Sequence, residues 1–328
     1  MSKIIQFNNI CKDFKIMAKK KGVNAFVGFF KREKKIIEAL KNVTFEIEEG
    51  DIVGYIGPNG AGKSTTIKIM SGILTPTSGE CSIMGYTPWK NRKQYVKNIG
   101  VVFGQRSQLW WDVPIIDSFE LLKDIYKIPD KEYEETLNEL VKTLNLGELL
   151  NRPLRQLSLG QKMKCELAGS LLHRPKILFL DEPTIGLDAV TKLSVREFIK
   201  TINKKWGTTI ILTTHDMSDI DALTNKIILI GRGQILYNGS FSEIKQKYDK
   251  TKLIEVEFAQ EYPSIDFEGY EVVSHNKNMA VLKNLPTTTF HTKDFINGIS
   301  KKYEVVDFSV KSISVDEILA KLYTELNL

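Results

Sequence analysis

The chain has 328 residues, of which 42% are hydrophobic and 26% charged, and its formal net charge is +6. This length suits about two domains with full cores. The charge is too diffuse to indicate nucleic acid by itself, and no nucleic-acid partner is expected. No apolar run approaches the ~18 residues that span a bilayer, and three scattered cysteines indicate neither a disulfide framework nor a zinc site. Because residues 1–6 lack a signal peptide's apolar stretch, we expect a cytoplasmic chain, peripheral on the inner face of the cell membrane.

The first predicted strand covers residues 4–7, and the stretch that follows it is unusually basic. Between Lys12 and Lys35 nine Lys or Arg residues face two acidic ones, and Phe26–Phe30 is embedded among them. Bulky apolar side chains beside cations are typical of an element at a membrane surface or against a membrane-embedded partner. A solvated loop whose phenylalanines pack back onto the domain is the alternative, and the sequence leaves both open.

A glycine-rich loop lies between a predicted buried strand, residues 52–56, and a predicted helix, residues 64–72. Its glycines let the backbone turn so that successive N–H groups and the helix N-terminus face one concavity, which suits phosphate oxygens. Lys63 can reach the outer phosphates, and the Ser64 hydroxyl is placed for Mg²⁺. The residues expected to bind the nucleotide here are Gly57, Pro58, Asn59, Gly60, Ala61, Gly62, Lys63, Ser64, Thr65 and Thr66. The loop predicts a nucleoside-triphosphate site.

Strands and helices alternate along the next part of the chain. The predicted strands are residues 43–48, 80–85, 99–105, 177–182 and 209–214, and the predicted helices lie within 115–150, after 157–161 and at about 189–205. This alternation predicts an α/β fold whose ligands bind at the carboxyl ends of the strands. Because Gln105, Asp181, Glu182 and His215 all follow predicted strands, one site is expected to collect them with the phosphate loop.

The residue types at these strand ends suit phosphoryl transfer to water. Asp181 would hold the Mg²⁺ shell, and Glu182 would polarise the attacking water. His215 would donate a hydrogen bond to the γ-phosphate, and Gln105 would sense the γ-phosphate and Mg²⁺. A charge pair at the start of the next helix and a structural histidine are the alternatives. The predicted catalytic residues are Glu182, His215 and Gln105, and the predicted metal ligands are Ser64, Gln105 and Asp181.

The order of these motifs resembles the ATP-binding subunit of an ABC transporter. The resemblance covers about residues 3–240 and includes the phosphate loop at 57–65, Gln105, Leu-Ser-Leu-Gly-Gln at 157–161, Asp-Glu at 181–182, Gly-Leu-Asp at 186–188, and His215. It implies two copies that face each other head to tail, with each ATP between the phosphate loop of one and residues 157–161 of the other. The nucleotide-binding residues that it adds are Phe14, which stacks on adenine in this family, and Ser158, Gly160, Gln161 and Asp188. Core packing is the alternative for Phe14.

Two features depart from the family's minimum pattern. Leu159 replaces the glycine of the usual Leu-Ser-Gly-Gly-Gln, but Ser158 and Gly160 remain, so we expect a working ATPase. The basic insert, about residues 15–38, and Trp110-Trp111 resemble the branch whose separate membrane subunits export drugs, sodium, lipids or polysaccharides. In that branch the segment after the glutamine contacts the coupling helix of the membrane subunit. Two core tryptophans are the alternative.

From about residue 241 the pattern changes to that of a small α+β appendage. Residues 253–258 alternate strictly, 271–273 and 279–282 read as strands, and 314–326 as an amphipathic helix. We therefore predict an α/β phosphate-loop, ABC-type ATPase core at 1–240, with a helical subdomain at about 106–170, and an accessory domain at 241–328.

The predicted function is the ATP-hydrolysing motor subunit of a membrane exporter, with ATP and Mg²⁺ as cofactors. Its predicted partners are a second copy, or a paired ABC ATPase, and integral-membrane permease subunits, with membrane contact through the partner or the basic insert. A soluble ABC-type ATPase acting on ribosomes or DNA, and an import ATPase, are the alternatives. The single cassette, with no long coiled coil inside it, argues against the soluble class.

Overall fold

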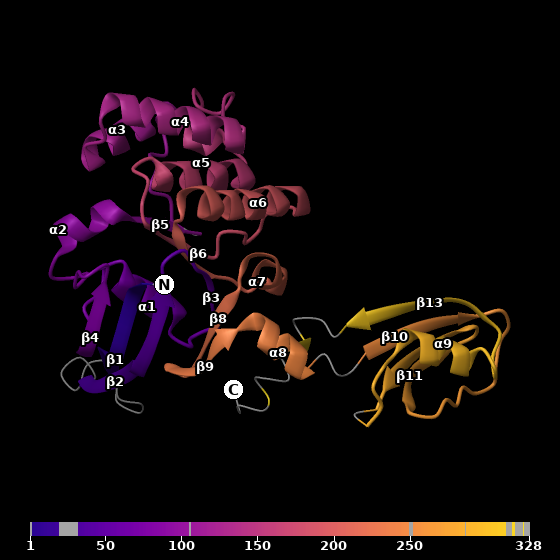
Figure 1. Cartoon of the computed structure of the whole chain (residues 1–328). Coiled ribbons are helices and arrows are strands. Elements are labelled where there is room, and N and C mark those ends of the chain that lie inside the picture. The colour runs from indigo at the N-terminus through magenta and orange to yellow at the C-terminus, as the bar shows by residue number, and fades with distance from the viewer. Residues whose placement is uncertain are drawn as a thin grey trace. The chain divides into compact units, whose positions relative to one another are not determined.

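The chain forms two compact units, residues 1–239 and 240–327. The computed structural model describes residues 2–19, 32–104, 106–248, 252–285, 287–312, 317–318 and 324 (Figure 1). Gln105, Phe26–Phe30 and most of the helix predicted at 314–326 lie outside the described residues.

The core of the first unit is a six-stranded sheet in which β3 lies near the centre. In spatial order its strands are β5 (Ile99–Phe103), β6 (Ile177–Asp181), β7 (Thr209–Thr213), β3 (Ile52–Ile56), β8 (Lys226–Gly231) and β9 (Gln234–Ser240). The neighbours from β5 to β8 pair in parallel, and every residue of β3 and β7 is buried. Strands covered on both faces need uninterrupted apolar runs, which is why these segments could be predicted. Their carboxyl ends meet at one edge, as expected.

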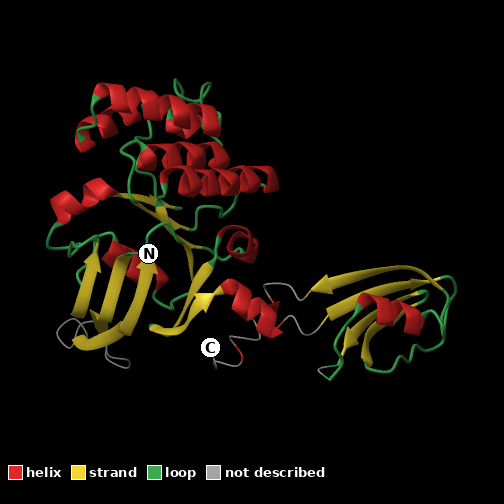
Figure 2. Cartoon of the chain, viewed as in Figure 1, coloured by secondary structure: helices red, strands yellow, loops and turns green. Residues whose placement is uncertain are grey.

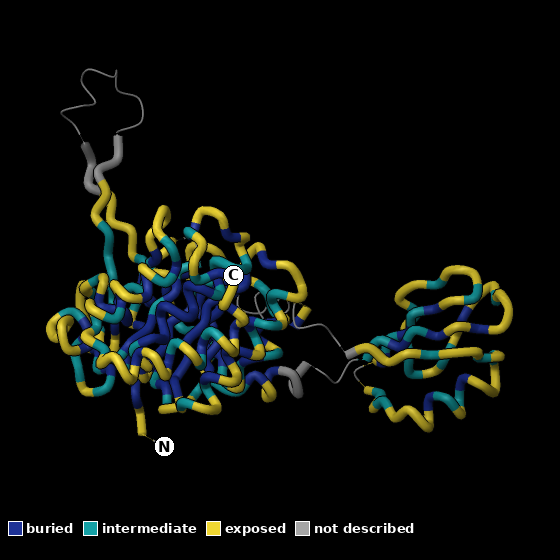
Figure 3. Tube along the Cα trace, turned by 90° about the horizontal axis from the view of Figure 1, so that it is seen from above, coloured by how far each residue is buried: buried dark blue, intermediate teal, exposed yellow. Residues whose placement is uncertain are grey.

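A second, antiparallel sheet has the order β2-β1-β4. Its strands are β1 (Lys3–Lys19), β2 (Arg32–Glu48) and β4 (Ser78–Ile83). The short strand predicted at residues 4–7 was too short, because β1 continues through register shifts between Phe7 and Asp13 instead of ending in a turn. The described parts of the basic insert therefore extend a two-stranded ribbon, residues 13–19 and 32–38, which we call the arm (Figure 3). A solvated loop was the wrong description for these residues.

The helices of the first unit lie on both sides of the parallel sheet and in a separate group (Figure 2). They are α1 (Lys63–Met70), α2 (Arg92–Tyr95), α3 (Ile115–Tyr126), α4 (Asp130–Leu144), α5 (Leu159–Leu171), α6 (Ala189–Trp206) and α7 (Met217–Leu223). The helical stretch predicted at 115–150 is two helices, since Lys127 takes a left-handed conformation and Pro129 follows it. Met163, Leu167 and Leu171 form the buried face of α5, as predicted.

The second unit is a four-stranded antiparallel sheet with one helix packed in its core. The elements after β9 are α8 (Phe241–Tyr248), β10 (Lys252–Phe258), β11 (Tyr270–Asn276), β12 (Met279–Asn284), α9 (Thr292–Ile299) and β13 (Val305–Ser312). Its strand order is β11-β12-β10-β13, and Phe295 and Ile299 of α9 are buried with Ile254 and Val256 of β10. The first three strands were predicted, whereas α9 and β13 were not. Of the helices in the described ranges, none combines the length and apolarity that a bilayer crossing demands.

Candidate nucleotide-binding site

A cavity of about 340 Å³ opens at the carboxyl edge of the parallel sheet. It is lined by Ser64, Lys68, Ile73, Phe103, Gly104, Arg106, Asp181 and Glu182. Ser64 comes from the phosphate loop after β3, and the two carboxylates come from the end of β6. Three segments that are far apart in the sequence, within 64–73, 103–106 and 181–182, therefore line one cavity.

The phosphate loop next to this cavity presents backbone atoms. Gly62 has φ +114° and precedes α1 with no side-chain cap, and the first turn of α1 has no acidic residue. At Gly57 a Cβ atom would lie 2.1 Å from the carbonyl oxygen of Ile230, so only glycine fits. The free N–H groups of a helix N-terminus make an anion site, and here no protein carboxylate caps it.

Lys63, which precedes Ser64, is a sequestered positive charge beside the phosphate loop. Its side chain is 7% exposed, and its Nζ donates to the carbonyl oxygens of Gly57 at 2.6 Å and Pro58 at 3.2 Å. Burial lowers the pKa of Lys63, and the Glu182 and Asp181 carboxylates partly offset that effect. A buried cation held by neutral carbonyl groups is well suited to receive an anion.

Ser64 and Asp181 lie where a magnesium ion would bind beside a phosphate. Both line the cavity, and Oδ1 of Asp181 accepts a hydrogen bond from Thr213 Oγ1 at 2.6 Å. Within the described residues there is no group of three His, Cys, Asp or Glu side chains that could hold a metal. This arrangement fits Mg²⁺, because that ion uses one or two protein oxygens and takes its other ligands from phosphate and water.

Glu182 and His215 form a hydrogen-bonded pair. His215 Nε2 lies 2.6 Å from Glu182 Oε1, and both side chains are partly exposed. Glu182 has φ +58°, an unfavourable conformation for a side chain of this size, and its N–H donates to the Thr213 carbonyl at 3.0 Å. The pair also lines a second hollow of about 240 Å³ on the other side of Glu182. The structure thus brings together two of the three predicted catalytic residues, while Gln105 lies outside the described residues.

Ser158, Gly160, Gln161 and Asp188 lie apart from the phosphate loop in this single chain. Ser158 caps α5 in a reciprocal capping box with Gln161. Asp188 caps α6 through the N–H and hydroxyl of Thr191, which lower its pKa. A Cβ at Gly160 would lie 2.7 Å from Thr191, so the two helix starts pack closely. Their predicted nucleotide contacts require a second copy of the chain and stay a prediction.

Phe14 and the tandem tryptophans differ in how far they are exposed. Phe14 is half-buried in β1, opposite Ile37, with Lys12 Nζ 5.3 Å from the centre of its ring. Trp110 and Trp111 are 42% and 55% exposed, so the alternative of two core tryptophans is wrong. Lys162 Nζ lies 4.5 Å above the Trp111 ring.

The sequence analysis missed a buried carboxylate behind the pair formed by Glu182 and His215. Asp219 is fully buried in α7 and accepts hydrogen bonds from Thr184 and Thr214, which lie close to Glu182 and His215 in the chain. The short Thr side chains beside both catalytic candidates were the available signal. That they share one partner depends on where α7 lies in the fold, because Thr184 and Asp219 are 35 residues apart.

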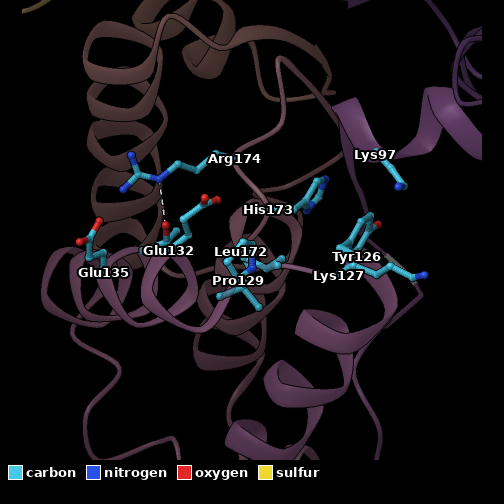
Figure 4. Close-up of a pocket in the computed structure, with 11 residues that line it drawn as sticks. Lys97, Tyr126, Lys127, Pro129, Glu132, Glu135, Leu172, His173 and Arg174 are labelled. Carbon is cyan, nitrogen blue, oxygen red and sulfur yellow. Dashed lines mark hydrogen bonds between the residues drawn. The ribbon is translucent and has the colours of Figure 1, made fainter.

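A further cavity of about 310 Å³ lies at the helical group, lined by Lys97, Tyr126, His173 and Arg174 among others (Figure 4). Two of its polar side chains, Arg174 and His173, contact neighbouring helices. Arg174 Nε donates to Thr136, and its guanidinium also contacts Glu139 and the Trp206 ring. His173 stacks on Tyr126 with ring centres 3.9 Å apart. These contacts indicate a structural joint between helices.

Comparison with known proteins places this chain in a family. Residues 40–185 match the family described as ABC transporter. The ABC transporter ATP-binding protein NatA of Bacillus subtilis is 30% identical over 215 residues, which make up 66% of this chain and 87% of NatA. The methionine import ATP-binding protein MetN 2 of Enterococcus faecalis is 32% identical over 249 residues, 70% of this chain and 72% of MetN 2.

Longer relatives and solved structures agree with this assignment. Two ABC transporter A family members of Dictyostelium discoideum are 33% identical to the chain, which spans 24% and 28% of their lengths. A solved dimeric ATP-binding cassette in a post-hydrolysis state, bound to ADP and Pi, matches with a TM-score of 0.61 and 28% identity. That match covers 72% of this chain and 98% of the cassette. The chain therefore belongs to the ABC transporter family, as an ATPase cassette followed by a second unit.

Proposed function

We propose that this chain is the ATP-hydrolysing motor subunit of a membrane exporter whose transport path lies in separate permease subunits. The observation that supports this most directly is the convergence of Ser64, Asp181 and Glu182 on one cavity, with Lys63 next to Ser64 in the chain and His215 bonded to Glu182. A backbone anion site, a buried cation and a paired carboxylate are the parts that phosphoryl transfer to water requires.

The binding step is assigned to the phosphate-loop end. The N–H groups at the start of α1 donate to phosphate oxygens, and Lys63 exchanges its contacts with Gly57 and Pro58 for a phosphate. Ser64 and Asp181 would hold Mg²⁺, which would neutralise charge on the phosphates. Thr213 orients the Asp181 carboxylate from the neighbouring strand.

The hydrolytic step is assigned to Glu182 and His215. Glu182 accepts a proton from the attacking water, and His215 holds the Glu182 carboxylate in place at 2.6 Å. Asp181 bonds to the Thr213 hydroxyl and Glu182 to His215, so the two neighbouring carboxylates have different partners and are assigned separate tasks. Gln105 is proposed to sense the γ-phosphate, as its place after β5 suggests.

We also propose that the cassette works as a homodimer, or with a paired ABC ATPase. The face that carries residues 157–161 and the start of α6 exposes apolar side chains, namely Leu159, Ile185, Val190 and Leu193, the last two at 77% and 60%. Exposed apolar groups of this size favour burial against a partner. In the dimer Ser158 and Gly160 would reach the γ-phosphate of the other copy, and Asp188 would couple the two sites.

The permease is proposed to dock beside Trp110 and Trp111. A groove of about 160 Å³, mainly apolar, runs between this segment and the start of α5. Its residues include Arg106, Trp111, Leu154, Leu159, Lys162 and Met163. Exposed tryptophan beside a small apolar groove is typical of a site that receives a helix from another protein.

The arm is proposed as a second contact with the membrane or its proteins. Ile16, Ile36 and Ile37 are 43%, 57% and 44% exposed, and Lys15 and Lys35 are exposed beside them. Apolar side chains among lysines favour an anionic lipid surface. These contacts would hold the chain at the inner face of the cell membrane. Residues 241–328 are proposed as an accessory domain that regulates the ATPase.

The experiment that tests this function is the ATPase rate of the purified chain, alone and with the membrane proteins encoded beside it. Stimulation by those proteins in vesicles, absent in Glu182→Gln, would support the motor role. The direction of transport is read in inside-out vesicles with a candidate cargo, where accumulation means export. Turnover that ribosomes or DNA raise, and membrane partners do not, would contradict the proposal.

A further inference from the structure

We propose that Asp219 is a positioning residue for ATP hydrolysis, because it ties together the two loops that carry Glu182 and His215. Asp219 lies in the first turn of α7 and has no exposed surface. It lines neither of the two hollows beside Glu182. Any effect on the reaction therefore passes through other residues.

The contacts of Asp219 reach both loops at once. Its Oδ2 accepts a hydrogen bond from Thr184 Oγ1 and another, at 2.9 Å, from Thr214 Oγ1. Thr184 is two residues after Glu182, and Thr214 immediately precedes His215. One carboxylate oxygen thus joins the end of the β6 loop to the end of β7.

The other carboxylate oxygen is fixed by a cation from α6. Arg196 Nε donates to Asp219 Oδ1 at 2.6 Å, and Arg196 also donates to Ser218. Thr184 and Thr214 are 2% and 3% exposed, so Asp219 and both threonines are closed to solvent. A buried carboxylate that loses a partner cannot recover the bond from water, and this makes the arrangement resistant to small displacements.

The geometry of the pair formed by Glu182 and His215 needs such support. Glu182 has φ +58°, which a residue with a side chain adopts only when its surroundings fix it. The Glu182 N–H is held by Thr213 on one side, and the loop beyond is held by Asp219 through Thr184. The same Asp219 oxygen holds Thr214 and so sets the position from which His215 reaches Glu182 at 2.6 Å.

This inference rests on the proposed roles of Glu182 and His215, and it predicts a separation of kinetic constants. Asp219→Asn keeps the size of the side chain but cannot accept from both threonines and from Arg196 together. We expect kcat to fall about 10- to 100-fold, the loss typical of catalytic groups displaced by about 1 Å, while KM for ATP changes less than about twofold. Equal losses in binding and turnover would contradict a positioning role.

A matched control separates positioning from simple loss of stability. Ile220 is the next residue of α7, is fully buried, and packs against β3 near Gly54. Ile220→Ala loosens the same helix without touching the polar group. At a temperature where both variants are folded, Ile220→Ala should retain nearly normal kcat, and a loss as large as that of Asp219→Asn would overturn the proposal.

A second pair of variants serves if Asp219→Asn does not fold. Thr184→Ser keeps the hydroxyl that donates to Asp219, whereas Thr184→Val keeps the shape and loses it. We expect near-normal kcat in the first and a several-fold lower kcat in the second, and equal rates in the two would refute the link.

The Glu182→Gln background distinguishes failure of this inference from failure of the proposed function. If Asp219 acts through Glu182, Asp219→Asn causes no further loss of the residual rate in that background. If its effect is independent of Glu182, the residual rate falls by the same factor as in the wild-type chain. If Glu182→Gln alone retains full turnover, the assignment of Glu182 fails first, and the effect of Asp219→Asn in the wild-type chain is still measured.

Discussion

The candidate nucleotide site has a backbone end, around the phosphate loop, and a side-chain end, around Glu182 and His215, and the two differ in the groups that they offer. At the backbone end the groups proposed to bind phosphate are main-chain N–H groups and a single lysine, which is held by the carbonyl oxygens of Gly57 and Pro58. At the side-chain end the groups proposed for hydrolysis are Glu182 and His215, and the residues around them are held by further side chains, Thr213, Thr184 and Asp219. Because the groups at the two ends are held by different partners, we expect ATP binding and ATP hydrolysis to be separable by mutation.

The largest effect is expected at the side-chain end. Glu182→Gln keeps the hydrogen-bonding shape but removes the base, so kcat should fall about 10²- to 10⁴-fold. ATP affinity, measured by equilibrium binding, should stay within about threefold, and the ATP-bound dimer should accumulate on a sizing column. Normal turnover in this variant would remove Glu182 from the catalytic role.

At the backbone end we expect a smaller effect, and we expect it on ATP binding and not on turnover. Lys63→Ala removes a buried cation next to the phosphates, and charge-assisted contacts of this kind are worth about 1.5–3 kcal/mol. We expect ATP affinity to weaken about 10- to 100-fold, as measured by titration with a fluorescent nucleotide. Lys68→Ala, which changes another lysine at the cavity wall, is the control. Unaltered affinity in Lys63→Ala would contradict its phosphate role.

Thr213 contacts both carboxylate residues at the end of β6. Its hydroxyl donates to Asp181 at 2.6 Å and accepts from the Glu182 N–H at 3.2 Å. Thr213→Val should raise the Mg²⁺ concentration needed for half-maximal turnover several-fold, since losing such a bond costs about 1 kcal/mol. Thr213→Ser should behave like the wild type. If the two variants have the same magnesium dependence, Thr213 does not orient Asp181.

The smallest effect on the chemistry is expected at His173, which lies between the helical group and β5. Burial lowers its pKa from 6.5 to about 4, partly offset by the hydrogen bond between Nε2 and the Ile99 carbonyl. Because its folded pKa lies below the unfolded value, the unfolded state binds the proton more strongly, and stability falls as the pH drops from 6.5 towards 4. Between pH 7 and pH 5 the loss is about 2 kcal/mol.

Urea unfolding at the two pH values measures this loss. His173→Gln removes the titrating group and should flatten the dependence while leaving kcat at pH 7 within about twofold. An equally steep dependence in that variant would assign it to other groups.

Much of the backbone end could be predicted from the sequence. The glycines of residues 57–62, the apolar run before them and the strand-end acids at 181–182 are local patterns, and local geometry dictates their use. The N-caps that the structure shows at Ser158 and Asp188 also depend on residues within one turn.

The side-chain end could be predicted only in part. His215 was placed correctly after its strand, but its bond to Glu182 depends on β6 and β7 being neighbours, and Asp219 enters only because α7 folds back beneath both loops. The length of the arm likewise depends on pairing between β1 and β2, which are separate in the chain. Contacts between residues that are near in the chain could be predicted from local sequence patterns. Contacts between residues far apart in the chain could be known only from the packing of the fold, because a buried polar group bonds to whichever partner the packing brings within reach.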